Sequence, residues 1–135
     1  MDEENEFEGM SHDELLRLGA DRFNAGLYFE AHEAWEEVWL DAERPLRHFY
    51  QGLIQVAAAF VHLRRDEYPG TVKLLHEGIR KLEACPPATL GVDLARFTRE
   101  TRLIETRVLE LGEKRIREIE PEALPKVAMA PSEPA

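Results

Sequence analysis

The stretch Phe49–Leu63, Phe-Tyr-Gln-Gly-Leu-Ile-Gln-Val-Ala-Ala-Ala-Phe-Val-His-Leu, decides the fold of this chain. It contains no Asp, Glu, Lys or Arg, although 33% of the chain is charged. On a helix its apolar side chains surround almost the whole axis, and a helix of that kind is normally covered on every side. At about 1.5 Å per residue it extends only about 22 Å, which is too short to cross a bilayer. We therefore expect a buried central helix over residues 48–63 and no membrane contact.

One narrow polar stripe interrupts this apolar surface. Gln51, Gln55 and His62 fall within roughly 40° of one another on the helical wheel. A buried amide or imidazole without a hydrogen bond costs about 1–3 kcal/mol. The stripe therefore requires polar partners on a neighbouring helix.

Further helices are expected around the central one, packed as antiparallel pairs. Ser11 and Glu14 form a capping box that begins the first helix, and Gly26 suits its left-handed C′ position. Apolar spacing and prolines place the helices at about residues 12–24, 28–40, 48–63, 69–84 and 94–111. Tyr28 and Tyr68 each begin the second helix of a pair, which suggests a helical-hairpin repeat. The predicted fold class is all-α, a bundle of about five helices, with no strand pattern.

The helical domain is expected over residues 11–120, because both flanks differ from it in composition. Residues 1–10 are acidic and contain a single aromatic, which predicts a flexible N-terminus. Residues 121–135 are rich in proline and predict an extended, flexible tail.

Charge and cysteine content argue against several functions. Residues 1–37 contain twelve acids and two bases, which accounts for the net charge of −10, whereas residues 38–135 are balanced. Without a strongly basic face, nucleic-acid binding is not expected. The single cysteine, Cys85, rules out an intramolecular disulfide and a thiolate zinc site. The acidic N-terminus has no signal-peptide pattern, so we expect a cytoplasmic protein.

The helix at 28–40 carries the ionisable pair that is best placed to bind a metal ion or take part in a reaction. His32 and Glu36 lie one turn apart, and both fall in the apolar sector of the helical wheel. Such a pair can bind one metal ion, and His62 of the central helix could supply a third ligand for zinc, manganese or iron. Glu33 would then act as general base. The pattern matches the His-Glu-x-x-His zinc motif only in part, because Glu36 replaces the second histidine.

The same polar residues also have a purely structural interpretation. A buried network between the second and third helices would fix their register and angle by hydrogen bonds. Both interpretations draw on one set of residues: Asn24, His32, Glu36, Gln51, Gln55 and His62.

Two segments carry a resemblance to a known family. They are Phe23-Asn24-x-Gly26-x-Tyr28-Phe29-Glu30-Ala31-His32-Glu33-x-Trp35-Glu36-x-x-Trp39 and Phe49-Tyr50-Gln51-Gly52-Leu53-Ile54-Gln55. In these residues the chain resembles domain-of-unknown-function family 309, small helical proteins of bacteria and archaea, over about Leu18 to Leu82. The resemblance implies a helical bundle with a His-Glu-x-x-Glu segment, and it implies no activity.

Two functions follow as expectations. The first is a non-catalytic scaffold or interaction protein that binds a second copy of itself or another protein. The alternative is a metal-dependent hydrolase that uses His32, Glu36 and His62 as ligands.

Overall fold

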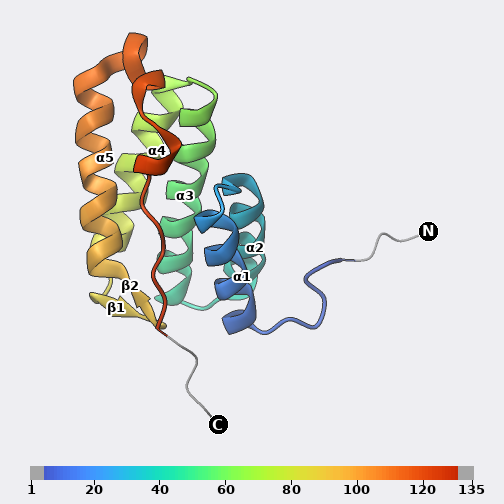
Figure 1. Ribbon diagram of the computed structural model, residues 1–135. Coiled ribbons are helices and arrows are strands. Elements are labelled where there is room, and N and C mark those ends of the chain that lie inside the picture. Colours follow the sequence, from blue (N-terminus) through green and yellow to red (C-terminus); the bar gives the residue numbers. More distant parts are fainter. Residues whose placement is uncertain (1–4, 131–135) are drawn as a thin grey trace.

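The structure is a computed structural model that describes residues 5–130. Its helices are α1 (His12–Asn24), α2 (Tyr28–Asp41), α3 (Leu46–Arg64), α4 (Tyr68–Glu83) and α5 (Leu94–Arg115). The predicted all-α bundle is confirmed, and the helices run antiparallel in sequence order (Figure 1). The flexibility predicted for residues 1–4 and 131–135 concerns parts of the chain outside the described residues. Within 5–130, no helix is both long and apolar enough to cross a membrane.

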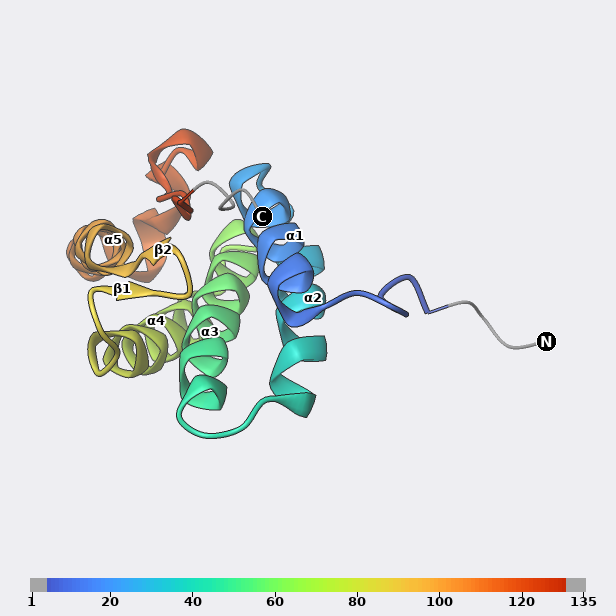
Figure 2. The same ribbon diagram turned by 90° about the horizontal axis from the view of Figure 1, so that it is seen from below.

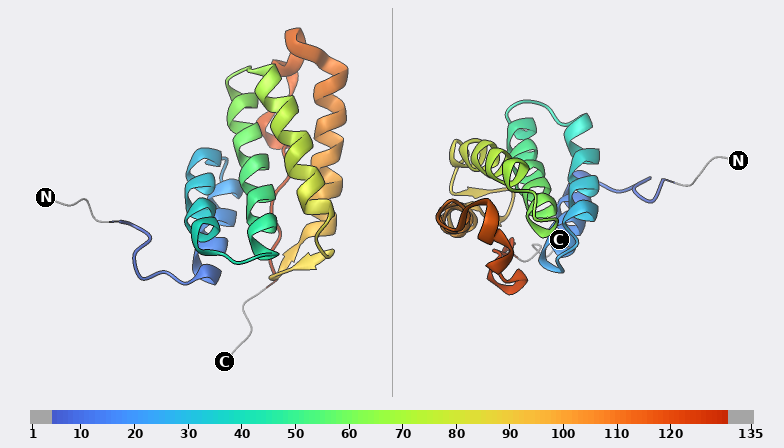
Figure 3. Two further views of the ribbon diagram at one scale, coloured as in Figure 1. Left: turned by 180° about the vertical axis from the view of Figure 1, so that it is seen from behind. Right: turned by 90° about the horizontal axis from the view of Figure 1, so that it is seen from above.

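The helix α3 is central, as predicted, but it is not covered on every side. It packs between α2 and α4, α1 packs on α2, and α5 packs on α4. Seen from below (Figure 2), α1, α5 and the C-terminal segment lie together on one side of α3. The opposite side, formed by α2, α3 and α4, faces the viewer in the left panel of Figure 3. We call this side the outer face.

Aromatic rings fill the centre of the bundle. Phe23 lies at 4.9 to 5.7 Å, centroid to centroid, from the rings of Tyr28, Trp35, Phe60 and Phe97. The Trp35 side chain is fully buried, and its Nε1 donates a hydrogen bond to a backbone oxygen of α1 at 3.1 Å. The aromatic core therefore joins α1, α2, α3 and α5.

The turn between α1 and α2 confirms the predicted helix end. Gly26 has φ of +81°, and its N–H donates to Phe23 O at 3.0 Å. Leu27 N donates to Arg22 O at 2.9 Å, which completes a Schellman motif. Glycine adopts this left-handed conformation without the strain of a Cβ.

The turn between α3 and α4 repeats this geometry about forty residues later. Asp66 takes the left-handed position with φ of 57°, and its N–H donates to Leu63 O at 3.0 Å. Glu67 N donates to His62 O at 2.9 Å. The two hairpins therefore share one turn design, which accounts for the repeat seen in the sequence.

Two glycines allow α3 and α4 to approach closely. A Cβ built on Gly78 would lie 3.0 Å from Gly52 O and 3.1 Å from Val56 N, both backbone atoms of α3. A Cβ on Gly52 would lie 3.2 Å from Gly78 O. The backbones of the two helices are therefore in direct contact at this crossing.

The chain between α4 and α5 contains strands that the sequence did not predict. Ala88–Thr89 (β1) pairs antiparallel with Val92–Asp93 (β2). Each strand has two residues, too few for an alternating pattern to be visible in a sequence.

After α5 the chain turns through η1 (Ile116–Glu118) and η2 (Pro121–Ala123) and then runs between α1 and α5. We call residues 119–130 the strap. Leu124 and Val127 are buried, and the side-chain amide of Asn24 bonds both Val127 O, at 2.9 Å, and Val127 N, at 2.7 Å. The tail predicted to be flexible from residue 121 is thus packed up to residue 130. Proline content alone did not indicate that Leu124 and Val127 are buried or that Asn24 bonds Val127.

Candidate functional site

The pair His32–Glu36 forms as predicted but lies at the surface. His32 Nε2 is 3.0 Å from Glu36 Oε2, and the two side chains are 27% and 47% exposed. The expectation that both point into the core is therefore wrong. The buried side of α2 is formed largely by small residues and Trp35, whereas Phe29 and Leu40 are 52% and 64% exposed. Because the prediction counted these two large residues as buried, it placed the apolar sector on a side of α2 that faces solvent.

One atom of His32 has no partner among residues 5–130. Its Nδ1 is buried and makes no hydrogen bond, while the ring stacks on Phe29 with centroids 5.9 Å apart. Pairing with Glu36 and stacking on Phe29 together fix the orientation of this imidazole.

The remaining members of the predicted cluster have other partners. His62 Nδ1 lies 3.0 Å from Glu67 Oε1, across the α3–α4 turn. Gln55 donates to Glu77 Oε2 at 3.2 Å and accepts from Lys81 Nζ at 2.8 Å, so it joins α3 to α4. A single network between α2 and α3 is therefore not formed. Asn24 lies apart from all of them, against the strap.

The structure does not bring the three proposed metal ligands together. His32 and Glu36 contact each other, and His62 contacts Glu67. In the described part of the chain, no group of three or more His, Cys, Asp or Glu side chains is arranged to hold a metal ion. Glu33, the proposed base, is an exposed residue of α2.

The outer face carries two hollows at the beginning of α3. The first has a volume of about 430 Å³ and is bordered by Trp39, Arg44, Pro45, Arg47, His48 and Gln51. The Arg47 guanidinium stacks over the Trp39 ring at 4.3 Å from its centroid. The second hollow has a volume of about 350 Å³ and is bordered by His48, Glu77, Arg80, Lys81 and Ala84. Because they share His48, the two hollows are adjacent.

These hollows concentrate positive charge in an acidic protein. Within residues 5–130, Arg44, Arg47, Arg80 and Lys81 make no ion pair with a carboxylate. This group is not apparent in the sequence, because its members come from two segments about 35 residues apart. The signal available was the Arg44–His48 segment, which runs into the beginning of α3, and the Arg80-Lys81 pair near the end of α4.

Between its contacts with α2 and α4, α3 presents a half-buried stripe to solvent. The stripe contains Gln51, Ile54, Gln55, Ala58, Val61 and His62. Ile54 and Val61 pack partly on the core, as do Trp39 of α2 and Leu74 of α4. The outer face is therefore partly apolar as well as basic.

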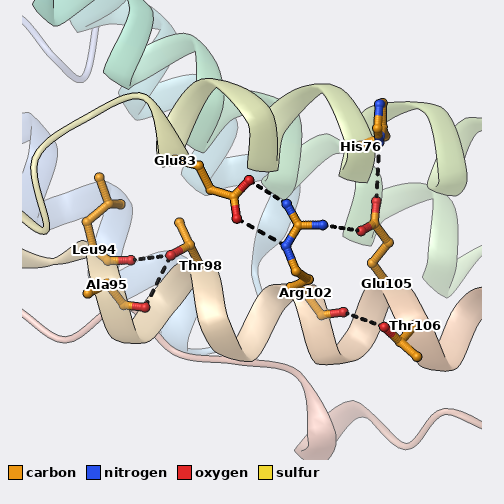
Figure 4. A network of polar contacts seen from close by, with 8 residues as sticks. All are labelled: His76, Glu83, Leu94, Ala95, Thr98, Arg102, Glu105 and Thr106. Atoms are coloured by element: carbon orange, nitrogen blue, oxygen red, sulfur yellow. Dashed lines mark hydrogen bonds and ion pairs between the residues drawn. The ribbon is translucent and has the colours of Figure 1, made fainter.

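On the other side of α4, an ion-pair network fastens α5 (Figure 4). Arg102 donates two hydrogen bonds to Glu83 and one to Glu105, the latter at 3.2 Å. His76 Nδ1 lies 3.7 Å from Glu105 Oε2. The hydrogen bonds that Arg102 donates to Glu83 raise the pKa of Arg102, so the guanidinium stays charged. The network has a structural role, since it links two helices that also share core contacts.

Residues 16–74, which include α2, α3 and parts of α1 and α4, match the family described as Domain of unknown function (DUF309). The uncharacterised protein YpuF of Bacillus subtilis (strain 168) is 38% identical over 73 residues, which are 52% of this chain and 42% of YpuF. An uncharacterised protein of Aquifex aeolicus (strain VF5) is 28% identical over 85 residues, which are 62% of this chain and 26% of that protein.

The chain thus spans less than half the length of these curated relatives. The matched region contains both segments on which the resemblance was based. The expected resemblance is therefore confirmed: residues 16–74 match the model of domain-of-unknown-function family 309.

Proposed function

We propose that this chain is a non-catalytic interaction protein whose outer face binds a second copy of the chain. One observation carries the proposal: α1, α5 and the strap cover the inner side of α3, while its outer stripe is left half-exposed between α2 and α4. A partly apolar face of this kind is typical of a protein-binding surface.

The composition of the face supports a protein partner. Phe29 and Leu40 are exposed near the two ends of α2, and Trp39 with its stacked Arg47 lies at the same end as Leu40. Aromatic and arginine side chains supply much of the binding energy in protein interfaces. Half-buried Ile54 extends the apolar surface toward α3.

Charge complementarity supports a second copy as that partner. Glu33 and Glu36 lie in the middle of α2, whereas Arg44 and Arg47 follow its C-terminal end and Arg80 borders the adjacent hollow. About a twofold axis through this face, the carboxylates of one copy would meet the cations of the other twice. Such complementary charges fix register and favour the correct partner.

Sedimentation equilibrium over a range of protein and salt concentrations tests the proposal. We expect a reversible dimer that weakens as salt increases, because its charges are solvent-exposed at the rim. Replacing Arg80 by glutamate should raise the dissociation constant by about tenfold. Replacing Arg99 by glutamate is the matched control, because Arg99 is an exposed arginine of α5 away from this face.

A chain that stays monomeric at every concentration would overturn the proposal. Equal weakening by Arg80→Glu and Arg99→Glu would also overturn it, because net charge and not this face would then govern association. Among residues 5–130 no contact favours the hydrolase alternative, since His62 is paired with Glu67 and His32 with Glu36.

A further inference from the structure

A separate hollow lies on the inner side, where three distant parts of the chain meet. The turn between α1 and α2, the end of α3 and the strap enclose a volume of about 290 Å³. Phe23 and Leu124 form apolar walls, and Tyr28, Arg64, Lys126 and Glu122 bring polar groups to it. The hollow is remote from the basic group at the beginning of α3, because Arg64 is the last residue of that helix.

Tyr28 supplies a hydrogen-bond donor that has no acceptor. The residue is only 6% exposed, and its ring is held edge-on by Phe23 at 4.9 Å and Phe60 at 5.4 Å. Within the described residues its hydroxyl makes no hydrogen bond, and the oxygen keeps contact with solvent. Burial raises the pKa of this phenol, so it remains protonated and able to donate. The ring of Tyr28 is buried while its hydroxyl stays accessible at the hollow, so the hydroxyl is free to donate to a bound ligand.

Arg64 supplies a positive charge beside that hydroxyl. A Cβ built on Gly26 would lie 3.5 Å from Arg64 Nη1, so the guanidinium extends along the α1–α2 turn. The charge of Arg64 is close enough to Tyr28 to lower the phenol pKa in opposition to burial. Arg64 forms no ion pair with any carboxylate in residues 5–130.

Lys126 adds a second positive charge from the strap. Its Nζ donates to Asn24 O at 2.8 Å, which holds the ammonium at the wall of the hollow. Glu122 is the acidic residue among the lining side chains, so Arg64 and Lys126 leave a net positive charge. The arrangement offers two unused donors and excess positive charge next to an apolar wall.

We propose that this hollow binds a small oxyanion, a carboxylate or a phosphate group, through the Arg64 guanidinium and the Tyr28 hydroxyl. Guanidinium groups form the strongest and most directional hydrogen bonds with such anions. The Phe23 and Leu124 walls suit a ligand whose acid group is attached to an apolar part. Because the strap forms one wall, a bound anion also holds the strap against the helices.

Calorimetric titration of the full chain tests the site, with inorganic phosphate and with acetate as separate probes at constant ionic strength. We expect saturable binding of at least one probe in the millimolar range, and the preferred probe distinguishes a phosphate from a carboxylate ligand. Replacing Arg64 by glutamine should weaken binding by about tenfold or more, because a charged hydrogen bond is lost. Replacing Tyr28 by phenylalanine should weaken it by about threefold to tenfold, while the ring keeps its packing.

Replacing Arg65 by glutamine is the matched control, because Arg65 is the next residue, is exposed and does not border the hollow. Its affinity should equal that of the unmodified chain. The absence of saturable binding of both probes would overturn the proposal. Equal losses for the Arg64 and Arg65 variants would also overturn it, since they would indicate only general attraction to a basic helix end. Neither result bears on association through the outer face.

Discussion

Replacing Gly78 by alanine tests whether α3 and α4 depend on direct backbone contact. The new Cβ would lie 2.9 Å from Val56 Cγ2, 3.0 Å from Gly52 O and 3.1 Å from Val56 N. A side chain can rotate away, but the two backbone atoms can move only if the helices separate. Overpacking of this kind costs about 1–3 kcal/mol, whereas the better helix propensity of alanine returns about 1 kcal/mol. Because the contacts involve backbone atoms, the cost falls in the upper part of this range, about 2–3 kcal/mol, and we expect a net loss of about 1–2 kcal/mol in the free energy of unfolding.

Urea denaturation followed by far-ultraviolet circular dichroism measures this loss as a lower midpoint at an unchanged slope. In thermal unfolding, the same loss corresponds to a Tm lower by roughly 4–8 °C. Gly70→Ala is the matched control on the same helix. Its Cβ would lie 2.8 Å from His62 Nδ1, but that ring is 36% exposed and free to shift, so stability should change by less than about 0.5 kcal/mol. A Gly78→Ala protein as stable as the unmodified chain would refute the backbone-contact argument.

Three further predictions concern the strap, the core and the metal question. Asn24→Ala removes both hydrogen bonds to Val127, so the free energy of unfolding should fall by about 1–3 kcal/mol. The Val127 amide should also exchange its hydrogen faster, and unchanged exchange would contradict the anchoring role of Asn24. Burial raises the pKa of Tyr50 from its ordinary 10.0 to about 12. The unfolded chain therefore loses this proton first, so stability is complete below pH 10 and falls as the pH rises toward 12. In alkaline denaturation, the loss of stability should be smaller for Tyr50→Phe than for the unmodified chain. An identical pH profile for the two proteins would contradict this prediction. For protein purified without a tag or chelator, plasma mass spectrometry should find less than stoichiometric zinc, manganese or iron. Near-stoichiometric metal in the unmodified chain that is absent from both His32→Ala and Glu36→Gln would instead support the hydrolase alternative.

The sequence was sufficient to predict the helices and their order because strong local signals mark their ends. The capping box at Ser11 and Glu14 is present, with Glu14 N donating to Ser11 Oγ at 3.1 Å. Gly26 ends α1 in the left-handed conformation that its position suggested. These features depend on residues close together in the chain, and such signals are visible without tertiary information.

The candidate site was harder to predict, because burial depends on which neighbours a helix has. On a helical wheel Phe29 and Leu40 look like core residues. His32 and Glu36 lie near them on the wheel, so they are predicted to face the core as well. In the fold, α2 turns Ala31 and Trp35 to its neighbours, and both large residues remain exposed. Small buried residues such as Ala31 carry little weight in an apolar pattern, although they allow close helix packing.

The hollows could not be predicted for a related reason. Arg64 and Lys126 border the same hollow but are more than 60 residues apart, and only the path of the strap brings them together. Proline-rich composition indicates an extended chain, which the strap is, but composition does not show which surface it packs on.

The strap has a consequence for the order in which the chain folds. Trp35 bonds a residue 19 positions away, whereas Asn24 bonds Val127 across 103 positions. Closing the longer loop costs about 1.5 kcal/mol more in chain entropy, by the logarithmic dependence on loop length. During synthesis the strap also leaves the ribosome after all five helices. The surface that Leu124 and Val127 cover in the folded protein is therefore exposed in the nascent chain until the strap packs on it.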